Sequence, residues 1–121
     1  MSRAAKTVLV FGLYLLTLGI VILLVPNLFL GIFGLAPTSE VWIRVVAMLV
    51  LILGFYYVAA ARAEMRPFFS WTVPARASVV LFFGAFVALD MTKPILLLFG
   101  AVDFAAAMWT AWALRLEGST R

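Results

Sequence analysis

Four long apolar stretches constrain this chain more than any other feature of its sequence. They extend over residues 8–25, 41–61, 73–89 and 94–116, and charged residues gather at their ends. A helix needs about 20 apolar residues to cross roughly 30 Å of hydrocarbon. Soluble domains average about 45–50% apolar and 25% charged residues, whereas this chain of 121 residues is 67% apolar and 12% charged. We therefore expect a single all-α domain over residues 1–121, a polytopic membrane protein built as a four-transmembrane-helix bundle.

Proline and polar residues between these stretches predict where the helices end. Pro26 disfavours helical geometry in the residue before it, so residues 28–35 are expected to follow the interface or to extend the helix beyond a kink. Pro67 is expected to close the second helix. Pro74 is expected to lie in the first turn of the third helix, where proline is tolerated. Residues 90–94 predict a tight polar turn before the fourth helix.

The absence of cysteine and histidine excludes several kinds of chemistry. Without them the chain offers no thiolate or imidazole ligand for zinc, haem or iron–sulfur clusters, and no thiol–disulfide exchange. The net charge of +4 comes from residues at the ends of apolar stretches, whereas nucleic-acid binding requires a basic face. We expect no bound metal or cofactor, no nucleic-acid partner and no enzymatic activity.

The distribution of lysine and arginine predicts the orientation in the membrane. One side of the expected bundle collects Arg3, Lys6, Arg62, Arg66, Arg76, Arg115 and Arg121. The other side has only Arg44 and Lys93. Because short cytoplasmic segments carry the excess of positive charge, both termini are expected to be cytoplasmic.

Asp103 is the charged residue that lies farthest from any expected helix end. It follows Pro94 by nine residues, which corresponds to a depth of about 14 Å. A carboxylate at that depth costs roughly 2.5–3.5 kcal/mol on insertion scales. Gly100, Ala107 and Thr110 share its helix face, and small residues favour helix contacts in lipid. We expect this face to point into the bundle, with Asp103 as a candidate ligand-binding or ion-pathway residue.

Candidate partners for Asp103 follow from matching depths. Thr17 lies about 14 Å from the start of the first apolar stretch, and Arg44 lies about 4.5 Å below the outer end of the second. Arg44 is expected to pair either with Asp103 or with the nearer Glu40 or Asp90. A second polar layer is expected from three tyrosines, whose buried hydroxyls usually find partners: Tyr14, Tyr56 and Tyr57.

The segment between the second and third helices is rich in arginine and aromatic residues. Such residues settle at the headgroup boundary and can contact anionic lipids or the cytoplasmic surface of a partner. The expected interfacial anchors are Arg62, Arg66, Phe68, Phe69, Trp71 and Arg76.

This part of the chain also carries a family resemblance. The runs GFYY at 54–57, AR at 61–62 and PFFSWTV at 67–73, followed by Arg76, resemble a pattern in small uncharacterised bacterial integral membrane proteins, loosely of the BphX-like and DoxX-like kind. The resemblance covers about a fifth of the chain. It implies a compact four-helix protein of the bacterial inner (plasma) membrane and transfers no catalytic residues.

Two functions remain open at this point. The first is a non-enzymatic binding or accessory component, for a hydrophobic small molecule or within a larger membrane complex, with a membrane-protein partner or a second copy of the chain. It predicts a cavity beside Asp103 bounded by Thr17 and Arg44. The alternative is a small transporter or proton-coupled permeation unit that uses Asp103. A tightly packed centre would favour a scaffold instead.

Overall fold

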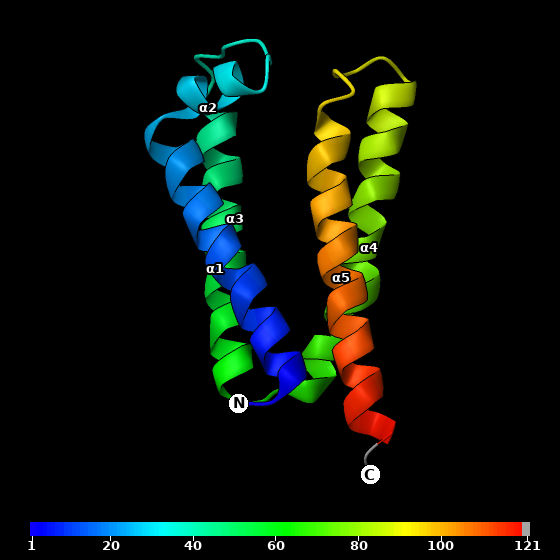
Figure 1. Cartoon of the computed structure of the whole chain (residues 1–121). Helices are drawn as coiled ribbons and strands as arrows, with labels where there is room; N and C mark the ends of the chain where they lie inside the picture. Colours follow the sequence, from blue (N-terminus) through cyan, green and yellow to red (C-terminus); the bar gives the residue numbers. More distant parts are fainter. Residues whose placement is uncertain (120–121) are drawn as a thin grey trace.

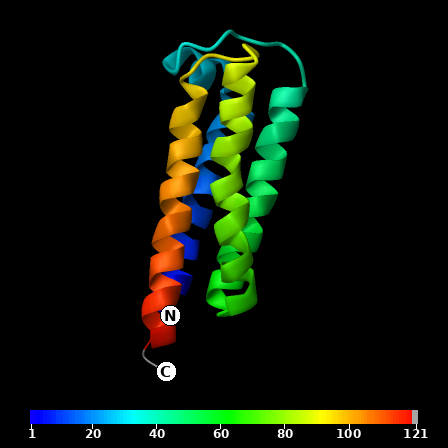
Figure 2. The ribbon, with the colours of Figure 1, turned by 90° about the vertical axis from the view of Figure 1, so that its right-hand side faces the viewer.

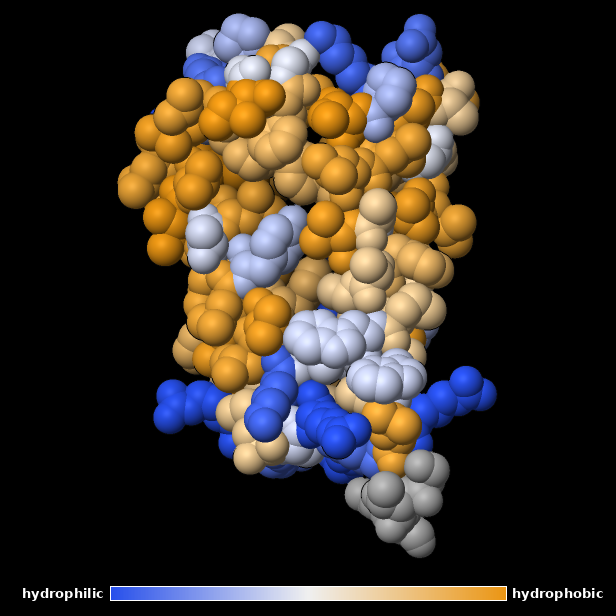
Figure 3. Space-filling model, in the orientation of Figure 1, coloured by the Kyte–Doolittle hydropathy of each residue, from blue (hydrophilic) through white to orange (hydrophobic). Residues whose placement is uncertain are grey.

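The structure is a computed structural model that describes residues 1–119. Within these residues the chain forms only helices: α1 (Arg3–Leu24), α2 (Pro26–Ile32), α3 (Trp42–Arg62), α4 (Arg66–Ala88) and α5 (Leu96–Ser119). The four long helices, α1, α3, α4 and α5, are each long and apolar enough to cross a membrane. Their apolar side chains form a broad middle zone in Figure 3, and hydrophilic side chains gather at both ends. The all-α class and the four long apolar helices are thus confirmed.

The long helices are arranged as two antiparallel hairpins, α1 with α3 and α4 with α5 (Figure 1). The hairpins meet mainly where α1 packs on α5, and α3 hardly touches α4. They lie close together at the terminal end, where α1 begins and α5 ends, and diverge toward the loop end, where α2 lies. In Figure 2, α4 and α5 stand in front and α1 is visible behind them. The hairpins therefore pack against each other at the terminal end and lie farther apart toward the loop end.

Glycines allow the helices of each hairpin to approach closely. A Cβ atom on Gly12 of α1 would lie 3.0 Å from the Cβ of Tyr57 and 3.2 Å from the backbone nitrogen of Val58 on α3. A Cβ on Gly100 of α5 would lie 3.1 Å from the Cα of Val80 on α4. Such small residues let the backbones of the paired helices contact each other directly.

Two glutamates tie the chain together at the terminal end, and we call this arrangement the terminal clasp. Ser2 donates from its backbone nitrogen to Glu64 Oε1 (2.6 Å) and from its hydroxyl to Glu64 Oε2 (2.7 Å). Glu117 accepts from the backbone nitrogen of Ala4 (3.0 Å) and forms a salt bridge with Arg66 (2.5 Å). The clasp joins the start of α1, the turn between α3 and α4, and the end of α5.

The beginning of α4 corrects the expected helix boundary. The helix begins at Arg66 and not near residue 73, so Pro67 occupies its first turn. Pro74, which was expected in that position, lies inside the helix. Membrane helices tolerate an internal proline because neighbouring groups compensate for the lost hydrogen bond. The reversal before α4 is made instead by Glu64, whose φ of 53° lies in the left-handed region.

The segment after Pro26 forms the separate short helix α2 at the loop end. Gly34, with a φ of 71°, turns the chain away from it toward α3. Lys93, in the connection between α4 and α5, donates from Nζ to the Gly34 carbonyl oxygen (2.6 Å). The two hairpins are thus linked at the loop end by the hydrogen bond between Lys93 and Gly34. Below this link, a cavity lies between the hairpins.

Candidate functional site

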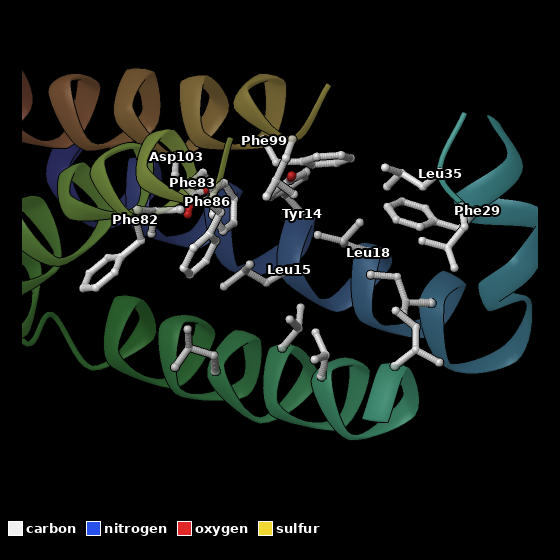
Figure 4. Close-up of a pocket in the computed structure, with 18 residues that line it drawn as sticks. Tyr14, Leu15, Leu18, Phe29, Leu35, Phe82, Phe83, Phe86, Phe99 and Asp103 are labelled. Atoms are coloured by element: carbon white, nitrogen blue, oxygen red, sulfur yellow. The ribbon is translucent and has the colours of Figure 1, made fainter. Parts of the chain in front are cut away.

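A cavity of about 550 Å³ lies between the two hairpins. Its size is within the range of about 300–1,000 Å³ found for small-molecule sites. All five helices contribute side chains to its wall, and Tyr14 and Asp103 are the two lining residues with side-chain oxygen atoms. Figure 4 shows Tyr14 on α1 and Asp103 on α5 reaching into this space, with Phe83 and Phe86 of α4 beside it. The site is therefore an apolar cavity with a small polar portion.

Aromatic rings close the cavity at the loop end. The rings of Phe29 and Phe33, carried by α2 and the residue after it, pack on Phe99 of α5 with centroid distances of 5.7 and 5.0 Å. The cavity is not fully enclosed. Its lining includes exposed side chains from two helices that hardly contact each other, Leu53 of α3 (49% exposed) and Phe82 of α4 (61% exposed). Both of these exposed side chains are apolar.

Asp103 reaches the cavity from the inward face of α5. Gly100, Ala107 and Thr110 are buried and Asp103 is half-buried, so the inward orientation expected from their spacing is confirmed. Within residues 1–119, neither the Asp103 carboxylate nor the Tyr14 hydroxyl forms a hydrogen bond to the protein. Both groups are therefore available to a molecule in the cavity.

Arg76 is the centre of a buried polar network next to this site. Its side chain is 3% exposed. It donates from Nε to the Thr72 carbonyl oxygen (3.3 Å) and from Nη2 to the hydroxyls of Thr72 (2.9 Å) and Thr110 (2.8 Å). Thr110 also shares a hydrogen bond of 2.7 Å with Thr7, and the guanidinium lies 4.8 Å from the ring centroid of Phe11. The network joins α4, α5 and α1, and Nη1 of Arg76 has no hydrogen-bond partner within the described residues.

The counter-charge of Asp103 is Arg76. The two side chains attract each other electrostatically, although no direct salt bridge joins them within residues 1–119. Arg76 was expected to anchor the chain at the interface, and this prediction is wrong. Because α4 begins at Arg66, Arg76 lies ten residues into the helix, about 15 Å from its start. Pro67 is a sequence signal for this earlier helix start, but Pro74 gives the same kind of signal.

The other two candidate site residues lie away from the cavity. Thr17 is exposed on α1 and donates to the Leu13 carbonyl oxygen of its own helix (2.9 Å). Arg44 is exposed on α3 and donates from Nε to the Leu23 carbonyl oxygen (3.2 Å). Within the described residues Arg44 forms no salt bridge with Asp103 or with either alternative partner, Glu40 or Asp90. Matching depth in the membrane predicts Thr17 and Arg44 as partners of Asp103. Depth does not determine, however, which way a side chain faces around the helix axis.

The three tyrosines expected to form a polar layer separate into two groups. Tyr14 lines the cavity, and Tyr57 is buried with its ring centroid 5.4 Å from that of Phe11. The Arg76 guanidinium lies 5.7 Å from the ring centroid of Tyr57. Tyr56 is 55% exposed on the outer face of α3. Tyr14 and Tyr57 therefore belong to the site, and Tyr56 does not.

The remaining expected anchors also differ in position. Phe69 is 0% exposed, and Phe68 packs edge-on against Tyr57 with a centroid distance of 5.3 Å, so both stabilise the interior. Arg66 forms the salt bridge of the terminal clasp. Arg62 and Trp71 are exposed near the terminal end, where an anchor must lie.

The residues of the cavity do not form a metal site. In the part of the chain that the structure describes, no three metal-ligating side chains cluster together. No family model, curated protein or solved structure matches the chain. The chemistry of the site therefore follows from its own side chains, which offer one carboxylate and one phenol in an apolar space beside a buried guanidinium.

Proposed function

We propose that this chain is a multi-pass membrane protein that binds an apolar molecule taken from the bilayer. The observation that carries the proposal is the cavity of about 550 Å³ into which Asp103 projects without a hydrogen bond from residues 1–119. A polar group in hydrocarbon is costly unless it is compensated. A bound molecule with a polar end supplies that compensation, and its apolar part covers the remaining wall.

The location we propose is the bacterial inner membrane, with both termini cytoplasmic. With Arg76 placed in the interior and Arg121 outside the described residues, the terminal end still carries Arg3, Lys6, Arg62, Arg66 and Arg115. The loop end carries Arg44 and Lys93. This excess supports the orientation through the positive-inside rule. Bacterial origin rests on the resemblance to the BphX-like and DoxX-like proteins.

A photoreactive alkyl diazirine incorporated into vesicles with the full chain tests the binding proposal. Cross-linked peptides should include cavity residues such as Leu18 and Phe83. Val50→Trp places a large side chain in the cavity wall and should lower cavity labelling by about tenfold. Ile52→Trp, on the exposed face of the same helix, is the matched control and should leave labelling unchanged. Labelling confined to the outer surface, or equal in both variants, would contradict the proposal.

A second candidate function is proton-coupled transport, and one observation favours it. A series of polar side chains continues from the cavity toward the terminal end: Asp103, Arg76, Thr110 and Thr7. Intramembrane carboxylates with such neighbours are typical of proton relays. In reconstituted vesicles, Asp103→Asn should abolish a pH-dependent flux that Asp90→Asn, in the exposed turn after α4, leaves intact. An absence of flux with the unmodified chain would exclude this candidate.

A further inference from the structure

We propose that the molecule bound in the cavity is a lipid alcohol, an amphipathic molecule with an uncharged hydroxyl head placed at Asp103 and Tyr14. This inference rests on the proposed function and specifies its ligand. Three features support it: the balance of buried charge, the hydrogen-bonding capacity of the two side chains, and the position of the polar groups within the cavity.

The charge balance favours an uncharged head. The interior beside the cavity contains one cation, Arg76, and one anion, Asp103. The other titratable groups that face them, Tyr14 and Tyr57, are uncharged in their usual state. An ammonium head would add an uncompensated positive charge and a carboxylate head an uncompensated negative one. In a low-dielectric interior either excess is costly, whereas a hydroxyl leaves the balance unchanged.

The hydrogen-bonding groups favour a hydroxyl in particular. The ionised Asp103 carboxylate only accepts hydrogen bonds, and the Tyr14 hydroxyl both donates and accepts. Both groups belong to the lining of the same cavity. A hydroxyl head supplies the hydrogen-bond donor that the Asp103 carboxylate lacks, and its oxygen atom can also accept a hydrogen bond. A ketone or ester head has no donor for Asp103 and leaves that carboxylate without a partner.

The shape of the site fits an amphipathic molecule. Its cavity-facing oxygen atoms come from Tyr14 and Asp103, and along α1 the apolar wall continues from Tyr14 to Ile22, about 12 Å. The wall ends at the aromatic ring cluster of Phe29 and Phe99. An alkyl or isoprenoid chain can therefore extend toward the loop end while its hydroxyl remains near the middle of the bundle.

Binding of three probes of equal chain length tests this inference: cetyl alcohol, palmitic acid and cetylamine. Native mass spectrometry of the detergent-solubilised full chain measures their relative affinities. Cetyl alcohol should bind at least about tenfold more tightly than the other two probes. A hydrogen bond to a charged group changes an affinity by about this factor. Equal affinities, or tighter binding of either charged probe, would overturn the inference.

Two variants, each with a matched control, test whether the hydroxyl head of the ligand contacts Asp103 and Tyr14. Asp103→Asn should weaken cetyl alcohol binding by about tenfold and shift the preference toward palmitic acid, because Arg76 then lacks its counter-charge. Tyr14→Phe should weaken the alcohol by a smaller factor. Asp90→Asn and Tyr56→Phe, which change the same residue types at exposed positions, are the matched controls. Unchanged selectivity in both site variants would overturn the inference.

The outcomes separate this inference from the proposed function. If the alkyl diazirine labels the cavity but cetyl alcohol has no advantage, the cavity binds apolar molecules and the assignment of the head is wrong. If no probe reaches the cavity residues, both are wrong. Because Tyr14→Phe retains the ring that packs 5.4 Å from Phe11, it keeps the test available even if Asp103→Asn fails to fold.

Discussion

At the scale of single residues, Arg76 determines how the charge of Asp103 is accommodated. Its guanidinium is held by hydrogen bonds to Thr72 and Thr110, which fix its position next to α5. A buried arginine with such contacts is costly to leave unpaired. Asp103 and Arg76 therefore depend on each other, and both depend on the threonines that hold Arg76.

Thr110→Val tests the network around Arg76. The change removes the hydroxyl that accepts from Arg76 and shares a hydrogen bond with Thr7, and valine has nearly the same shape. Two buried groups then lose a partner, so stability should fall by about 1–3 kcal/mol. Thr17→Val is the control, because Thr17 is exposed and bonded only within its helix. Unfolding of the detergent-solubilised chain measures the stability of both variants. Equal losses of stability would contradict the role of Thr110.

The sequence predicted the direction in which Asp103 points but not its partner. The spacing of Gly100, Asp103 and Thr110 defines one helix face, and that face is buried. Residue depth along the helices predicts Thr17 and Arg44 as partners. Depth follows from counting residues, but the direction of a side chain around the helix axis depends on how the helices pack. That packing is a property of the folded hairpins.

At the scale of helices, the largest departure from the sequence prediction is the start of α4. Pro67 follows the charged segment after the second apolar stretch, Pro74 lies at the start of the third, and either can occupy the first turn of a helix. The structure uses Pro67, so seven more residues join the helix and Arg76 moves into the interior. The sequence pattern does not distinguish the two prolines. In the folded chain, Phe69 and Arg76, which both follow Pro67 in the helix, are buried.

Close contact between α1 and α3 predicts a strong effect of a larger residue at Gly12. Gly12→Leu forces the helices apart at Tyr57 and Val58 and should destabilise the chain by about 1–3 kcal/mol. Gly84→Leu is the control, since a Cβ there meets no atom within 4 Å and leucine favours helix more than glycine does. Thermal unfolding followed by circular dichroism distinguishes them. A stable Gly12→Leu variant would contradict the helix packing described.

The terminal clasp predicts a dependence of stability on pH. Hydrogen bonds from the Ser2 backbone nitrogen and hydroxyl lower the pKa of Glu64 below its usual value of 4.5. A lowered carboxylate pKa stabilises the fold above the usual value and loses that contribution as the pH falls through the lower, folded value. Glu64→Gln should therefore be less stable than the unmodified chain at neutral pH, and the difference should disappear in acid. Glu40→Gln, an exposed change at the loop end, should show no such trend.

At the scale of the whole molecule, the hairpins are joined firmly at the terminal end and diverge toward the loop end. Four apolar stretches predicted the helices, and the excess of positive charge predicted that both ends of the chain lie together. The division into two hairpins depends on the glycine contacts within each pair. No single stretch of sequence reveals the cavity, because its wall includes residues from all five helices.

The central claim is that the cavity receives an apolar molecule from the bilayer between α3 and α4. The chain contains no cysteine, so the pair Leu53→Cys and Phe82→Cys can be joined across this opening by a bifunctional maleimide. Joining them before the alkyl diazirine is added should abolish labelling of cavity residues, while each single-cysteine variant treated with the reagent should retain most of it. Undiminished cavity labelling in the joined protein would contradict the account.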